Sequence, residues 1–76
     1  MTRSIHLIAR DIKASWKNPY FGAVPYLNAM GGLYEASDDY GADSGKSIVL
    51  YFLANAQTWR GEDARRLKAE LREHVK

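Results

Sequence analysis

The segment from Ser47 to Trp59 constrains the fold more than any other, because none of its side chains is charged and most are apolar. A helix that is apolar on every face has to be enclosed by other elements. The next segment, from Glu62 to Lys76, is rich in charge and carries its apolar residues at helical spacing. Together the two segments predict a buried central helix, with Phe52 in the core, packed against a surface helix.

Two further helices are predicted before this segment. The first is a one-sided surface helix with an apolar stripe at helical spacing, made of Ile5, Ile8, Ile12 and Trp16. Thr2 or Ser4 is expected to cap it, and Asn18-Pro19 ends it because the residue before proline is pushed out of the helical region. The second is short and kinked, with its regular part starting near Pro25, an allowed first-turn residue, and Gly31-Gly32 ends it.

Residues 35–46 are rich in Gly, Ser and Asp, which predicts a loop before the central helix. Ser44 or Ser47 is expected to cap the central helix, which ends between Ala56 and Trp59 and is followed by Arg60-Gly61. The last helix starts at Glu62 and buries a stripe of Ala64, Leu67, Leu71 and Val75. We therefore predict one all-α domain over residues 1–76, a small bundle of three long helices and one short kinked helix around a central apolar helix.

The chain is short and contains no cysteine, so its stability is expected to come from helix packing or oligomerisation rather than disulfides. Its net charge of +2 is unevenly distributed: residues 1–18 carry +3, residues 19–59 carry −3 and residues 60–76 carry +2. We interpret this as basic end helices that neighbour an acidic loop, in preference to a nucleic-acid footprint. No segment approaches the roughly 20 apolar residues of a membrane span, and the N-terminus lacks the apolar core of a signal peptide. The expectation is a soluble cytoplasmic protein without membrane contact.

Motifs for catalysis, cofactors and metals are incomplete. Gly41–Ser47 resembles a phosphate-binding loop, but Gly41 lies one residue too close to Gly45-Lys46-Ser47, so ordinary capping is the better interpretation than an anion site. Asp38, Asp39 and Asp43 do not fit a calcium loop, because counting from Asp39 places Ser44 sixth and Leu50 twelfth. His6 and His74 are expected to be surface side chains. We predict no enzyme activity, no cofactor and no metal site.

The aromatic residues favour a protein-binding function. The chain contains nine aromatic residues, more than a core of this size hides, so several are expected to be partly exposed. Trp, Tyr and Arg are enriched at binding hot spots, which makes a candidate partner surface of Trp59, Arg60, Tyr20, Phe21 and Tyr26. Covering the ends of the core is the alternative role for each aromatic side chain. The partner is a second copy of the chain or another protein.

Binding of DNA is the alternative function. Four cationic residues share one face of the last helix, and with the preceding helix and turn they suggest a helix-turn-helix unit: Arg65, Lys68, Arg72 and Lys76. The same helix carries Glu62, Asp63, Glu70 and Glu73, which would repel phosphates.

Within the central helix, Asn55 is expected to form a hydrogen bond to a neighbouring backbone group or to a tyrosine. The second interpretation places Asn55 in a groove or a dimer interface.

The segments Trp16–Leu27 and Ser47–Leu71 resemble small uncharacterised proteins carried by bacteriophages and prophages, particularly those of actinobacteria. This resemblance covers most of the chain. It implies a cytoplasmic setting in a bacterial host cell and carries over no activity and no site residues. A non-catalytic role in protein–protein interaction, with a homodimer as one form of it, is therefore the preferred prediction.

Overall fold

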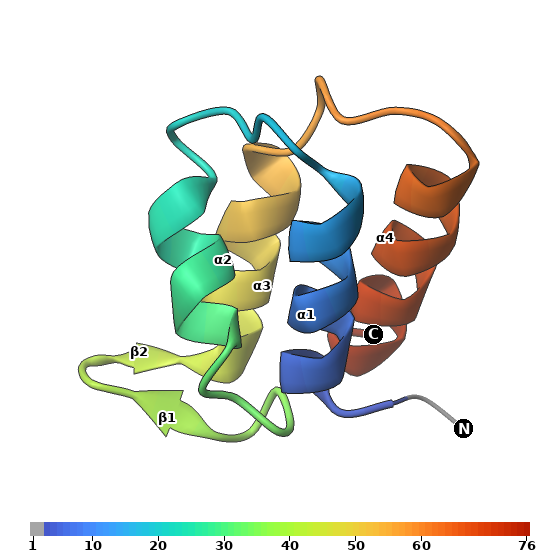
Figure 1. The fold of residues 1–76 in the computed structure, drawn as a ribbon. Coiled ribbons are helices and arrows are strands. Elements are labelled where there is room, and N and C mark those ends of the chain that lie inside the picture. The colour runs from blue at the N-terminus through green and yellow to red at the C-terminus, as the bar shows by residue number, and fades with distance from the viewer. Residues whose placement is uncertain (1–2) are drawn as a thin grey trace.

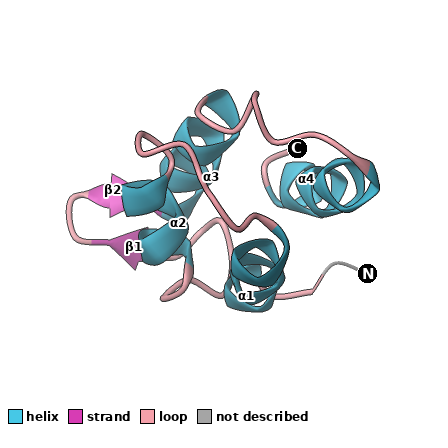
Figure 2. Ribbon diagram, turned by 45° about the horizontal axis from the view of Figure 1, so that its top comes forward, coloured by secondary structure: helices cyan, strands magenta, loops and turns pink. Residues whose placement is uncertain are grey.

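The computed structural model describes residues 3–76, which form four helices and one short hairpin. In chain order the elements are α1 (Ile5–Ser15), α2 (Val24–Met30), β1 (Asp39–Tyr40), β2 (Asp43–Ser44), α3 (Gly45–Ala54) and α4 (Glu62–His74). The helices run alternately up and down, with the hairpin at the foot of α2 and α3 (Figure 1). Viewed closer to the helix axes, α1 lies between α2 and α4 (Figure 2). The prediction of a mostly helical chain is correct.

All four helices contribute to one apolar core. The stripe of α1 is buried as predicted, and so are Phe52 of α3 and the stripe of α4 apart from Val75, which is half-buried. Burying a side chain of this size typically stabilises a fold by about 1.5–3 kcal/mol. The largest fully buried side chains are Phe52, Ile5, Ile8, Ile12, Met30, Leu33, Leu67, Leu71 and Val49.

The prediction of an enclosed central helix is wrong. α3 packs mainly against α2 and touches α4 only lightly, while α1 is the helix that packs against both α2 and α4. One side of α3 therefore faces solvent, where Leu50 is 46% exposed and Tyr51 50% exposed. α3 is apolar on every face, but other elements do not cover every face.

The start of α3 lies two residues earlier than Ser47, because the loop before it satisfies its first N–H groups. Ser44 is the N-cap, and its Oγ accepts from the N–H of Ser47 at 3.2 Å, which confirms one of the two predicted caps. The N–H of Gly45 donates to the carbonyl of Asp38 at 2.6 Å, and that of Lys46 to the carbonyl of Ala36 at 2.9 Å. These groups are engaged inside the chain and do not form an anion site.

The segment expected to be a plain loop contains the antiparallel hairpin, in which Asp39 pairs with Ser44 and Tyr40 with Asp43. The turn is made possible by Gly41, whose φ of 63° lies in the left-handed region. The prediction of an all-α fold therefore needs one correction, the two-stranded hairpin. This hairpin connects residue 38 to the first turn of α3.

Other helix ends differ modestly from the predictions. Ser4 occupies the N-cap of α1 without a side-chain hydrogen bond; the first N–H groups donate instead to the carbonyls of Tyr34 and Leu33. The alternative cap, Thr2, lies outside the described residues. Pro25 lies in the first turn of α2 as predicted, a position that needs no kink. α3 ends at Ala54, before the predicted Ala56–Trp59, and the chain then turns back toward the core.

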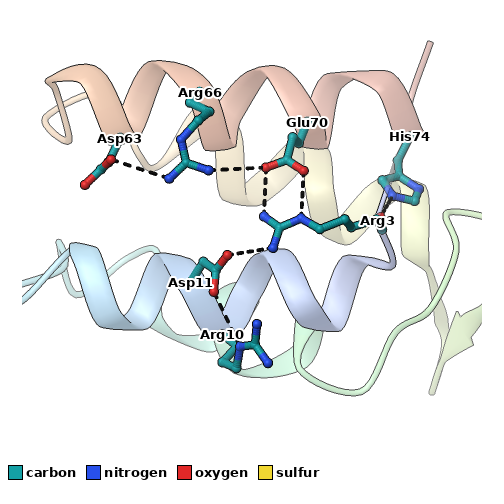
Figure 3. A network of polar contacts seen from close by, with 7 residues as sticks. All are labelled: Arg3, Arg10, Asp11, Asp63, Arg66, Glu70 and His74. Carbon is teal, nitrogen blue, oxygen red and sulfur yellow. Dashed lines mark hydrogen bonds and ion pairs between the residues drawn. The ribbon is translucent and has the colours of Figure 1, made fainter. Parts of the chain in front are cut away.

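An ion-pair network joins α1 to α4 (Figure 3). Arg3 donates to Asp11 at 2.7 Å and to both carboxylate oxygens of Glu70 at 2.9 and 2.8 Å. These hydrogen bonds hold the pKa of Asp11 and of Glu70 below their usual values and raise that of Arg3. Within residues 3–76 no ion pair involves a carboxylate of residues 35–46, so the predicted pairing of basic helices with an acidic loop is wrong.

The two histidines are half-buried rather than surface side chains. The Nε2–H of His74 donates to the carbonyl of Arg3 at 2.6 Å, which fixes the chain before α1 against the end of α4. The ring of His6 lies 4.5 Å from that of Tyr34, and its Nδ1 is buried without a hydrogen-bond partner in the described residues. Both contacts stabilise helix ends.

Candidate functional site

Charge is absent from the two neighbouring helices α2 and α3 over most of their length. Residues 18–34 and residues 47–59 contain no Asp, Glu, Lys or Arg. α2 and α3 pack side by side, so the two uncharged stretches are neighbours in the fold (Figure 1). The charged residues lie mainly on α1, α4 and the chain around the hairpin.

We give the name α2–α3 surface to the large side chains of these two stretches that are exposed or half-buried beside one another in the two ring pairs or next to them in sequence: Tyr20, Phe21, Tyr26, Leu50 and Tyr51. Tyr20 is 45% exposed and Phe21 79% exposed, and their ring centroids are 4.8 Å apart. Tyr26 is half-buried against the core and its ring lies 5.4 Å from that of Tyr51. The predicted exposure of Tyr20 and Phe21 is confirmed.

A shallow hollow of about 240 Å³ continues the surface beyond Tyr20. It is lined by Tyr20, Ala54, Asn55, Gln57 and Thr58. The side-chain amide of Asn55 donates to the carbonyl of Tyr51 at 2.9 Å, which confirms the predicted internal hydrogen bond and holds the amide at the C-cap of α3. Protein interfaces typically combine aromatic side chains at their centre with a polar rim, and this part of the molecule has both kinds of group.

Gly22 brings Tyr20 close to α3. A Cβ at this position would lie 2.6 Å from the ring of Tyr20 and 2.9 Å from Oδ1 of Asn55. The absence of a side chain therefore lets the Tyr20 ring lie beside Asn55, one helical turn beyond Tyr51. This packing joins the chain before α2 to the exposed side of α3.

The prediction that Trp59 belongs to a partner surface is wrong. It is only 5% exposed, and its ring stacks on that of Trp16 with centroids 5.3 Å apart and planes 8° apart. Phe52 meets Trp16 edge-on at 6.2 Å. Trp59 is a core residue because residues 55–61 turn back over the end of the bundle, where Trp16, the last residue of the predicted stripe of the first helix, is buried with it.

Arg60 lies apart from the tyrosines, in a second hollow of about 320 Å³ at the start of α4. We name it the basic hollow. Its cationic residues are Arg60, Arg65, Lys68 and Arg72, and Trp59, Gly61 and Ala64 complete its lining. Three of the four predicted DNA-binding residues thus lie together with one residue predicted to bind a protein.

Lys68 is the most constrained cation of the basic hollow. Its Nζ donates to the carbonyl of Trp59 at 2.7 Å and lies 5.7 Å from the centroid of the Trp59 ring. Burial, and then the charges of Arg72 and Arg60, lower the pKa of Lys68. The fourth predicted DNA-binding residue, Lys76, is not part of the lining and pairs with Glu73 at 3.1 Å.

Leu50 and Tyr51 are members of the α2–α3 surface that sequence reasoning missed. The available signal was the spacing of apolar residues along α3: Ile48, Val49 and Phe52 share its buried side, and Leu50, Tyr51 and Ala54 repeat the same interval on the exposed side. Two apolar stripes on one helix are compatible with full burial or with one buried and one exposed face.

No family model, no curated protein and no solved structure matches the chain. Residues 3–76 contain no group of three or more His, Asp or Glu side chains arranged to hold a metal ion. None of the four described helices is long and apolar enough to cross a membrane.

Proposed function

We propose that this protein acts without catalysis, through protein–protein contact at the α2–α3 surface, and that a second copy of the chain occupies this surface. The observation that carries the proposal is the set of large exposed side chains on α3 and in the turn before α2, within two stretches of the chain that carry no charge. Leu50 and Tyr51 are half exposed at the middle of α3, and Tyr20 and Phe21 are exposed in the turn before α2, where Tyr20 lies near Asn55.

The exposed area is close to what a small dimer requires. Large side chains of this kind present about 150–250 Å² each when fully exposed. At the observed exposures, Tyr20, Phe21, Leu50 and Tyr51 offer on the order of 400 Å² per copy. A symmetric pair buries about twice this area, and the polar groups around Asn55 add to it; the lower limit for a specific interface is roughly 1,000 Å².

A second copy suits the surface because the surface is uncharged. In a two-fold dimer the same patch meets itself, so a charge close to the axis would face its own copy and a patch with charges of one sign would repel itself. Residues 18–34 and 47–59 carry none, and the repulsion is absent. The tyrosine hydroxyls and the amide of Asn55 supply hydrogen-bonding groups that work equally well in both directions across the axis.

The resemblance to bacteriophage and prophage proteins supports a role of this protein in the cytoplasm of an infected bacterium. A short chain without cysteine gains stability there from the additional surface that a dimer buries. Self-association and a later contact with a host or phage protein are compatible, because the dimer leaves α1 and α4 free.

Sedimentation equilibrium tests the proposal with two matched variants. Tyr51 and Tyr40 are each 50% exposed, but Tyr40 lies on the hairpin, outside the α2–α3 surface. We expect the unmodified protein to sediment with twice the mass of one chain at high micromolar concentration. Tyr51→Lys should return the mass to that of one chain, since each copy would bring an unpaired ammonium group into an uncharged interface, and Tyr40→Lys should leave the dimer intact.

A mass of one chain for the unmodified protein would overturn the proposal. So would an equal effect of the two lysine variants, because this would mean that added charge rather than the α2–α3 surface controls association. The helix-turn-helix alternative is less supported, since Glu62 and Asp63 occupy the first turn of α4, the part of a recognition helix that meets the bases.

A further inference from the structure

The basic hollow at the start of α4 is separate from the surface at which we propose that the dimer forms. The hollow is formed by α4 and the turn before it, whereas the α2–α3 surface belongs to α3, α2 and the turn before α2. Its four cations, Arg60, Arg65, Lys68 and Arg72, come from two segments and converge on one concave site.

None of these four cations has a carboxylate partner among residues 3–76, in contrast to other cations of the same molecule. Arg66, on the next face of α4, pairs with Asp63 at 3.4 Å and approaches Glu70 at 3.9 Å. The chain thus supplies carboxylates for the α1 side of α4 and none for the basic hollow. Four positive charges line a hollow of about 320 Å³ and repel one another. A bound anion would offset this repulsion.

The positions of these groups suit an anion with several oxygens. Lys68 is held by its hydrogen bond to the carbonyl of Trp59, which leaves two of its N–H groups for a ligand. Arg60, Arg65 and Arg72 are exposed, and guanidinium groups bind phosphate through pairs of parallel hydrogen bonds. A carboxylate carries one charge and two oxygens, so it would leave more of the cationic groups unmatched than a phosphate does.

Trp59 lines the hollow but does not offer an open ring face. Trp16 is stacked on its ring, and the ammonium of Lys68 lies 5.7 Å from its centroid. A nucleobase therefore has no aromatic platform, the feature that base-stacking proteins rely on. Recognition in this hollow has to rest on charge and hydrogen bonds.

We propose that the basic hollow is a phosphate-binding site, which holds the phosphate group of its ligand without contact to a base. The phosphate comes from one of two sources, a small phosphate compound or the backbone of a nucleic acid. Because only the phosphate is recognised, binding to DNA should be independent of base sequence and should weaken steeply with salt.

The test compares three probes at about 50 mM salt. Inorganic phosphate and adenosine monophosphate are titrated by calorimetry, and a fluorescent DNA duplex by anisotropy. The double variant Arg65→Gln/Arg72→Gln removes two charges from the hollow. Lys13→Gln/Lys17→Gln is the matched control, since both lysines are exposed on or just after α1, lack ion pairs in the described residues and carry the same charge.

We expect the variant in the hollow to lose at least about tenfold in affinity and, for the duplex, about two units of the salt slope. The control should change affinity by less than about twofold, and both variants should keep the unfolding midpoint of the parent. Tight binding of the duplex with weak binding of inorganic phosphate identifies a nucleic-acid backbone as the source; equal binding of all three probes identifies a small phosphate compound.

Three results would overturn the proposal. The first is no binding of any probe at low salt. The second is an equal loss in the hollow variant and the lysine control, which would show attraction to net charge alone. The third is tighter binding of a polyglutamate peptide than of a duplex of equal charge, because it would make the hollow a site for an acidic protein segment. None of these depends on whether the protein is a dimer.

Discussion

Replacing Trp59 by Ala distinguishes a core residue from a binding residue. Trp59 is 5% exposed, stacks on Trp16 at 5.3 Å and lies beneath the ammonium of Lys68. Truncation of a buried Trp costs about 3–5 kcal/mol, and the lost ring stacking adds about 0.5–1.5 kcal/mol. A chain of 76 residues has about 4–11 kcal/mol of stability in total, so the variant should be close to unfolded or retain a small remainder.

Urea denaturation followed by far-ultraviolet circular dichroism measures this loss without relying on the fluorescence of the removed ring. With a slope of about 1 kcal/mol per molar urea, the midpoint should fall by about 3 M or more. Phe21→Ala is the control, since Phe21 is 79% exposed and its removal should change stability by no more than about 0.5 kcal/mol. A loss below about 1 kcal/mol for Trp59→Ala would refute its place in the core and return it to the candidate partner surface.

Gly45→Ala should lower the melting temperature, although Ala normally favours a helix by about 0.5–1 kcal/mol, because its Cβ would lie 2.8 Å from the carbonyl oxygen of Glu35. A higher melting temperature in calorimetry would show that the backbone of residues 35–38 does not pack closely against Gly45. Hydrogen bonds from Arg3 hold the pKa of Glu70 below its ordinary 4.5 and that of Asp11 below its ordinary 3.8. Near these pH values the unfolded chain therefore binds more protons than the folded chain, so the free energy of unfolding should decrease as the pH is lowered below them. Glu70→Gln should flatten this fall in acid denaturation monitored from about pH 5 to pH 3, and an unchanged curve would count against the network.

The helices with one apolar stripe were predictable and the helix with two was not. Ile5, Ile8 and Ile12 define a single buried side of α1, so the pattern determines the orientation of the helix. On α3, the pattern allows burial of Leu50 and Tyr51 as readily as their exposure. The number of neighbours decides between these outcomes, and that number depends on tertiary packing, which the local pattern does not contain.

The candidate sites were predicted in part for a similar reason. Exposure of Tyr20 and Phe21 follows from their place beside Pro19 and Gly22, in a turn before α2. Trp59 was misplaced because its burial depends on Trp16, a residue 43 positions earlier in the chain. Arg60 and the cations of α4 were assigned to two different partners, since only the turn at Gly61, with a φ of 116°, brings them around one hollow.

The packing of α1 against α4 joins the two ends of the described chain, and Arg3 reaches Glu70 across 67 positions of sequence. Such a contact closes a loop that contains most of the described residues, so its entropic cost falls on a late step of folding. A nascent chain that has been translated only as far as α3 still exposes the side of α1 that α4 will cover. The protein therefore completes its fold only after the last helix has been synthesised, and premature termination before Glu62 leaves an open core rather than a smaller stable unit.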